Sequence, residues 1–197
     1  MNLIDRVKNI LITPKTEWEV INGETATAQS LLMGYVLPLA IVASAGSLLK
    51  GLLFAGTNGM KFYIVTAIIA FIASAVAFYV ATIIIDMLAP SFDSEKNMGK
   101  SAQLVAYSGT ASYVGAFLSF IPVIGWLISL AAMVYGIYLM YLGIGPLKKT
   151  PEDKKVVYMI VAFLITTVLY FILVAILTAI LFAALGIGIA AGGFLRY

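Results

Sequence analysis

Five stretches of this chain are long and apolar enough to cross a lipid bilayer as helices. A hydrocarbon core about 30 Å thick needs roughly 20 apolar residues, because an α-helix rises about 1.5 Å per residue. The predicted spans are residues 30–49 (extending toward 54), 62–85, 102–121, 123–142 and 156–184. The sequence therefore predicts an all-α, polytopic membrane protein, a bundle of five transmembrane helices.

The composition favours the same class. Hydrophobic residues make up 62% of the chain and charged residues 11%, whereas soluble domains are about 45–50% apolar and about 25% charged. We divide the chain into an N-terminal cytoplasmic or interfacial segment (1–29), a transmembrane domain (30–185) and a short tail (186–197). Cysteine and histidine are both absent, so we expect no cofactor, no metal and no catalytic activity; nothing suggests nucleic acid as a partner.

Positive charge is distributed unevenly across these spans. Nine of the 12 basic residues fall in the N-terminal segment and in the second and fourth connections, which lie on one side of the membrane. All nine acidic residues lie there too. Because basic loops stay cytoplasmic, we predict a cytoplasmic N-terminus and a C-terminus on the opposite side. No signal peptide is evident, so the first span should direct insertion.

The segment before the first span has helical periodicity. Apolar residues recur every three or four positions, with polar residues between them: Leu3, Ile4, Val7, Ile10 and Leu11 against Asp5, Arg6, Lys8 and Asn9. This pattern predicts a short amphipathic helix in the membrane interface. A second helix should begin with Thr13 as N-cap and Pro14 at its first position, and should place Trp18 at headgroup depth.

The third and fourth spans carry most of the polar side chains. Tyr107 and Ser108 lie in the third span, which we expect to be central because polar groups in lipid need partners. Its small-residue ridge is explained by helix packing, or alternatively by a polar path or a headgroup pocket. Tyr135 and Tyr138 lie on one face of the fourth span, which is either a structural aromatic face or a ligand-binding surface.

Charged residues near the span ends are the remaining candidates. Asp86 closes the second span and is expected to reach headgroups and water, with an ion or proton role as the alternative. Four lysines, Lys148, Lys149, Lys154 and Lys155, flank the fourth connection and suit an anionic leaflet or a protein partner. Pro38 should kink the first span.

Several short motifs occur in a familiar order. They are Thr13-Pro14-Lys15-Thr16-Glu17-Trp18, Asp86 with Pro90, Ala106-Tyr107-Ser108-Gly109-Thr110, Ile121-Pro122, and Tyr135-Gly136-Ile137-Tyr138 through Gly143. In this order and frame the chain resembles the Yip family (Ypt/Rab-interacting, five-span membrane proteins), in its bacterial branch.

The resemblance implies a bacterial inner-membrane protein with a cytoplasmic N-terminus. Eukaryotic relatives are associated with Rab GTPases and vesicle traffic, but a bacterial cell offers no prenylated Rab. We therefore expect an adaptor, or a scaffold that organises membrane and lipid. Its partners would be anionic headgroups and a protein bound to the cytoplasmic loops. The alternative is a small transporter or channel for an ion or lipid, lined by spans three and four; such a pore would require a homo-oligomer. An intramembrane enzyme is the least favoured hypothesis.

Overall fold

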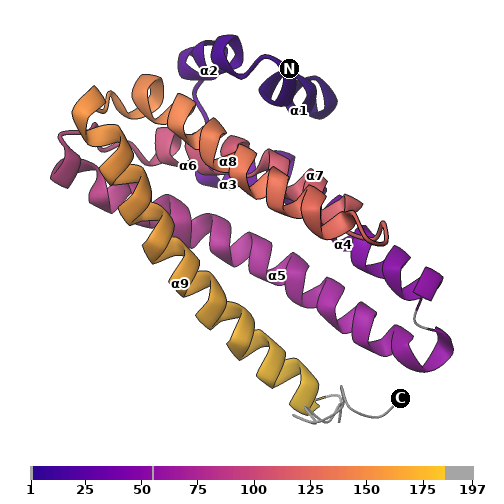
Figure 1. Cartoon of the computed structure of the whole chain (residues 1–197). Coiled ribbons are helices and arrows are strands. Elements are labelled where there is room, and N and C mark those ends of the chain that lie inside the picture. Colours follow the sequence, from indigo (N-terminus) through magenta and orange to yellow (C-terminus); the bar gives the residue numbers. More distant parts are fainter. Residues whose placement is uncertain (1, 55, 185–197) are drawn as a thin grey trace.

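The computed structural model describes residues 2–54 and 56–184, and these residues form helices and short connections without a strand. The elements, in chain order, are α1 (Leu3–Ile12), α2 (Pro14–Gly23), α3 (Ala28–Leu31), the π-helix η1 (Leu32–Val36), α4 (Leu37–Phe54), α5 (Gly56–Leu88), the 3₁₀-helix η2 (Ala89–Phe92), α6 (Met98–Ser108), α7 (Thr110–Leu118), α8 (Gly125–Lys148) and α9 (Glu152–Ala184) (Figure 1). The predicted tail, residues 186–197, lies outside the described residues.

Four of the predicted spans are long apolar helices in the structure. They cover Ala28–Phe54, Gly59–Phe92, Gly125–Lys148 and Glu152–Ala184. Only 6% of the most apolar window of α9 is buried inside the molecule, so most of its surface must face lipid. The chain is therefore a helical, polytopic membrane protein, as predicted.

The third predicted span is divided at Gly109 rather than continuous. It forms α6, of 11 residues, and α7, of nine, and neither alone is long enough for a core about 30 Å thick. The hydroxyl groups of Ser108 and Thr110 donate to the carbonyls of Leu104 and Tyr107, at 2.6 and 2.7 Å. Such bonds back to the preceding turn bend helices.

The α6–α7 unit lies at the centre of the bundle, as its polar composition predicted. α6 packs against α3, α5 and α8, and α7 packs against α4 and α8. A Cβ built on Gly115 would come within 2.5 Å of the Ala132 side chain on α8. The small-residue ridge of the third span is therefore a close helix-packing surface.

Local irregularities also follow from particular residues. The expected kink at Pro38 takes the form of the π-helical turn η1 just before it, where the Leu37 N–H bonds to the carbonyl of Leu32. α8 continues to Lys148, beyond the predicted end at residue 142. The connection to α9 therefore shrinks to residues 149–151, because the last turn of α8 is fixed in the protein interior.

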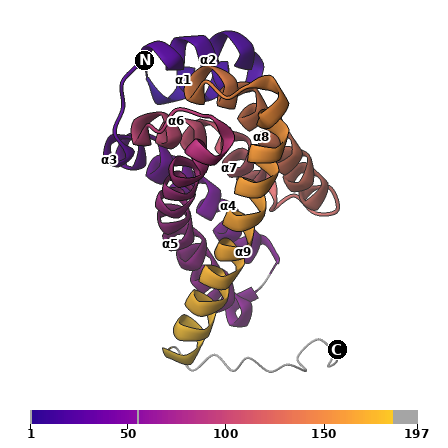
Figure 2. The ribbon, with the colours of Figure 1, turned by 90° about the vertical axis from the view of Figure 1, so that its left-hand side faces the viewer.

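The N-terminal helices fold over one end of the bundle (Figures 1 and 2). α1 contacts α2 and α7, and α2 contacts α8. Ile10 and Ile21 are completely buried and Trp18 is 1% exposed. The Trp18 ring is therefore covered by protein and does not contact the lipid headgroups directly.

One detail of the N-terminal prediction is wrong: Arg6, expected on the polar face of α1, is buried, whereas Ile4 is exposed. As predicted, Thr13 is the N-cap residue of α2 and Pro14 is its first helical residue. The Thr13 hydroxyl, however, donates to the carbonyl of Asn9 at 3.1 Å and makes no cap bond to α2. We name α1 and α2 with residues 24–27, 86–108 and 143–158 the polar cap, because they gather most of the charged groups at one end.

Candidate functional site in the polar cap

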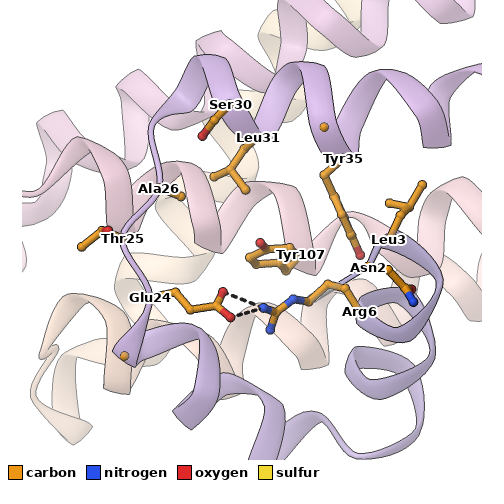
Figure 3. A pocket seen from close by; sticks show the side chains of 12 residues that line it. Asn2, Leu3, Arg6, Glu24, Thr25, Ala26, Ser30, Leu31, Tyr35 and Tyr107 are labelled. Carbon is orange, nitrogen blue, oxygen red and sulfur yellow. Dashed lines mark hydrogen bonds and ion pairs between the residues drawn. The ribbon is translucent and has the colours of Figure 1, made fainter.

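Arg6 is the centre of the first cluster in the polar cap. Its side chain is 6% exposed and forms ion pairs with two carboxylates, those of Glu17 and Glu24. The Arg6 Nη2 atom lies 2.5 and 2.6 Å from the two oxygens of Glu24 (Figure 3). A buried guanidinium requires such partners, since an unpaired buried charge is strongly destabilising. The two pairs fasten α1 to α2 and to the segment that follows it.

Aromatic rings pack against this cluster. The Arg6 guanidinium lies over the ring of Tyr107, 5.2 Å from its centroid, a favourable cation–π contact. The same ring meets Tyr35 edge-on at 4.8 Å and Trp18 at 6.3 Å. The Tyr35 hydroxyl and Thr110 Oγ1 are hydrogen-bonded at 2.7 Å. The predicted site residue Tyr107 therefore joins α6 to both the first span and the N-terminal helices.

Side chains of the bundle also satisfy the carbonyls at the ends of α1 and α2. Lys100 Nζ donates to the carbonyls of Asn22 and Glu24 at 2.6 and 3.0 Å. The Gln103 amide donates to the carbonyls of Ile21 and Glu24. The hydroxyl of Tyr135 donates to the carbonyl of Leu11 at 2.8 Å. Because helix C-termini leave carbonyls without intrahelical partners, these bonds hold the N-terminal helices in a defined position.

A pocket of about 550 Å³ opens beside the Arg6 cluster. Small-molecule sites usually measure about 300–1,000 Å³. Its walls come from α1, from the segment between α2 and α3, from the start of the first span, and from α6: Asn2, Leu3, Arg6, Gly23, Glu24, Thr25, Ala26, Ser30, Leu31, Gly34, Tyr35 and Tyr107. Figure 3 shows the Arg6–Glu24 pair and the Tyr107 ring together at this pocket.

Asp86, Ser101 and Lys148 form the second cluster. Lys148 Nζ lies 3.2 Å from Asp86 Oδ1 and 2.7 Å from Ser101 Oγ, and Ser101 Oγ donates to Asp86 at 3.0 Å. Asp86 is 3% exposed, and Lys148 and Ser101 are fully buried. The expectation that Asp86 reaches headgroups and water is wrong, as is the assignment of Lys148 to a basic surface. Each is the other's internal counter-ion.

A serine beside a lysine can act in nucleophilic catalysis when the lysine is neutral and substrate can approach. Here the Lys148 ammonium is paired with Asp86 and the three side chains are enclosed. The geometry instead ties together the ends of α5, α6 and α8. Within the described residues, no group of three acidic, histidine or cysteine side chains could hold a metal ion.

The other lysines of the fourth connection also have carboxylate partners. Lys149 pairs with Glu95 at 2.8 Å, Lys154 with Asp93, and Lys155 with Glu152 at 2.5 Å. The hydrogen bond and charge of Lys149 lower the pKa of Glu95. The same contact raises the pKa of Lys149. This loop is therefore closer to electrical neutrality than its sequence suggests.

The remaining predicted residues have packing contacts. The buried Ser108 side chain bonds within its own helix. Tyr138 is 42% exposed and its ring lies 5.7 Å from that of Tyr135. The hydroxyl of Tyr135 donates to the carbonyl of Leu11 in α1 and does not point to the third span.

Sequence reasoning missed Arg6, Glu24 and Tyr158. Arg6 follows Leu3 by three positions and precedes Ile10 by four, which places all three on one helix face and could have revealed it. Tyr158 is fully buried, donates a hydrogen bond to the carbonyl of Ile85 and stacks on Phe92 at 4.8 Å. No local signal marked that contact, because the partners are about 70 residues apart.

The family model of the Yip1 domain matches residues 8–176. That range includes both clusters except Arg6 and runs through most of α9. No curated protein and no solved structure matches the chain.

Proposed function

The chain belongs to the Yip1 domain family, and from this premise we propose that it is a non-enzymatic membrane adaptor or membrane-organising scaffold. Its working surface is the polar cap, on the cytoplasmic side of a bacterial inner membrane. The uneven distribution of basic residues supports this orientation. A C-terminal reporter that is active only outside the cytoplasm would agree with it, and a cytoplasmically active one would contradict it.

The observation that carries the proposal is the docking of the N-terminal helices. Two ion pairs of Arg6 and the carbonyl bonds from Lys100 and Tyr135 fix α1 and α2 on the bundle end. A fixed surface loses little conformational freedom on binding, so it favours association with a partner.

Free charge on this surface supplies the contacts. Within the described part of the chain, Lys8, Lys15 and Lys96 are exposed and have no carboxylate partner. They are available to acidic groups of a protein or to anionic headgroups. The paired lysines of the fourth connection contribute less, because their charge is already compensated.

The packing argues against the transport alternative. Where the third and fourth spans would line a path, a Cβ on Gly136 would lie 3.1 Å from the carbonyl of Ser108. Ser129 Oγ also donates across the same interface to the carbonyl of Gly115 at 3.2 Å. Helix backbones this close leave little room for a permeant species between them.

In-cell crosslinking tests the adaptor role. The tagged full chain is crosslinked, purified in mild detergent and analysed by mass spectrometry for copurifying proteins and lipids. We expect partners that are captured by the wild type and lost when Lys8, Lys15 and Lys96 are changed to glutamate. The matched control is Lys50→Glu, which reverses an exposed lysine at the opposite end of the first span.

The control decides between specific and general effects. Partners lost in the triple variant and retained in Lys50→Glu would support the polar cap as the working surface. An identical set of proteins and lipids from all three samples would contradict it.

A further inference from the structure

We propose that the pocket beside Arg6 binds the zwitterionic headgroup of an amine-bearing phospholipid, a phosphoethanolamine group. This assignment rests on the proposed membrane-organising role and specifies which lipid class the polar cap holds. It requires no protein partner.

The position of the pocket suits a lipid headgroup. Ser30, Leu31 and Gly34 form one wall, and they lie at the start of the Ala28–Phe54 span. Another part of the wall is α1, with Leu3 and Arg6. The first turns of a transmembrane helix lie where the hydrocarbon core meets the headgroups. Leu3 and Leu31 offer apolar contacts to the glycerol and upper acyl carbons.

The charges of the pocket match a zwitterion. Arg6 is held internally by Glu17, whose side chain is 6% exposed, whereas Glu24 is 39% exposed. A phosphate can take the place of the Glu24 carboxylate on the Arg6 guanidinium. Both groups, the planar carboxylate and the tetrahedral phosphate, present anionic oxygens that accept hydrogen bonds from a guanidinium. The ammonium group of the same ligand then pairs with Glu24, so neither charge is left without a partner.

An anion or a cation alone fits less well. A purely anionic headgroup would separate Glu24 from Arg6 and leave the Glu24 carboxylate without a cationic partner. A purely cationic ligand would draw Glu24 away and leave Arg6 with one carboxylate. A trimethylated amine carries the charge but has no N–H group to donate to Glu24, so it forms a weaker pair than a primary ammonium.

Tyr107 provides an independent indication of a ligand. The residue is 6% exposed, and its ring is fixed by Arg6, Tyr35 and Trp18. Among the described residues its hydroxyl group has no hydrogen-bond partner, and the residue lines the pocket. The hydroxyl is not among the buried polar atoms without a partner, so it is accessible from the pocket to a bound group. It can donate to the phosphate oxygens of a bound headgroup.

Lipid titration of the purified full chain tests the assignment. The delipidated protein in mild detergent is titrated with phosphatidylethanolamine, phosphatidylcholine or phosphatidylglycerol of identical acyl chains, and bound lipid is counted by native mass spectrometry. We expect phosphatidylethanolamine to bind about tenfold more tightly than either of the others, the difference of one charge-assisted hydrogen bond.

Three variants locate the binding. Tyr107→Phe removes only the free hydroxyl and should weaken phosphatidylethanolamine binding several-fold while the fold is kept. Glu24→Gln should abolish the headgroup preference. Gly34→Leu should obstruct the pocket, since a Cβ at Gly34 meets nothing within 4 Å and the helix accepts it. The matched control is Glu19→Gln, an exposed carboxylate of α2 that does not line the pocket.

The outcomes separate this inference from the adaptor role. Equal binding of the three lipids, or an unchanged preference in Tyr107→Phe and Glu24→Gln, would overturn the headgroup assignment even if crosslinking captures a partner. Competition by soluble phosphoethanolamine as strong as by the lipid would overturn the membrane origin of the ligand. A headgroup preference without any captured protein would support the pocket and contradict the adaptor role.

Discussion

The two ends of the molecule are held together in different ways. In the polar cap, buried ion pairs and side chain–backbone hydrogen bonds connect α1, α2, α5, α6 and α8. At the far end, α5 and α9 meet through a small apolar cluster of Val65, Ile69 and Phe182.

The difference follows from the solvent. Apolar helix faces gain little by leaving lipid for protein, because lipid tails are equally apolar. Polar groups removed from water must find specific partners, and each partner fixes a geometry. The contacts in the polar cap therefore determine how the helices are arranged, and the arrangement at the far end is a consequence of them. Four experiments test this contrast, in decreasing order of expected effect.

The largest effect is expected for Lys148→Met. It removes the counter-ion of Asp86, which is 3% exposed, and a buried charge left unpaired costs about 3–5 kcal/mol. The free energy of unfolding in detergent should fall by this amount. Adding Asp86→Asn should recover most of the loss, since the stranded charge is then removed.

Lys50→Met is the control for this experiment. Lys50 is exposed near the far end, and such surface changes are usually within about 0.5 kcal/mol. Equal losses in Lys50→Met and Lys148→Met would contradict the contrast between the two ends.

The second prediction concerns the contact beneath Trp18. A Cβ on Gly143 would lie 2.7 Å from the Trp18 ring and 2.9 Å from Leu104, so Gly143→Ala overpacks the core and should cost about 1–3 kcal/mol. Hydrogen exchange should increase over residues 3–23 in particular. Gly23→Ala, where a Cβ meets nothing within 4 Å, should leave the exchange unchanged.

A smaller effect is expected from Phe182→Ala at the far end. Phe182 is 8% exposed and its ring lies 6.1 Å from that of Phe62. In a soluble core this truncation costs about 3–5 kcal/mol. Here detergent or lipid can cover the gap, and we expect less than about 2 kcal/mol. Thermal unfolding provides the measurement, and a loss larger than that of Lys148→Met would reverse the ranking.

The smallest effect is a dependence on pH at the exposed Glu95–Lys149 pair. Lys149 lowers the pKa of Glu95 below its ordinary value of 4.5. A lowered pKa in the folded state stabilises the protein above the unfolded pKa, and the gain is lost as the pH falls through the folded value. Melting temperatures between pH 3 and 7 should show a slightly weaker acid dependence in Glu95→Gln. Identical profiles would mean that the pair contributes nothing.

The two ends also differ in how much of their structure could be predicted from the sequence. Length and hydropathy predicted four of the spans as long helices, because one local property, a run of apolar side chains, determines them. They did not predict the division of the third span at Gly109. The end of α8 was predicted too early because Lys148 was assumed to be in water. A lysine at a helix end usually has its charged group in water. Lys148 is stable in the interior because distant residues are its partners, above all Asp86, 62 positions away in the chain, together with Ser101.

The pocket was beyond the reach of sequence patterns for a similar reason. The third span was recognised as polar, and a headgroup pocket was one alternative for Tyr107. However, Arg6 and Glu24 come from segments that meet Tyr107 only after the bundle forms. Periodicity describes which face a residue lies on, but it does not say which other element covers that face.

The long-range character of the N-terminal docking has a consequence for biosynthesis. Arg6, Leu11 and Trp18 leave the ribosome first. Their partners are made later: Tyr107 for Arg6, Tyr135 for Leu11, and Tyr107 for Trp18, which also lies beside Gly143. At about 5–20 residues per second, roughly 6–25 s separate Trp18 from Gly143. During that interval the segment lacks the part of its docking surface that α8 provides. Docking of residues 3–23 is therefore a late step that follows the insertion of α8. Ribosome-arrested chains that end before residue 135 should leave residues 3–23 open to protease. Chains that extend beyond residue 184 should protect them.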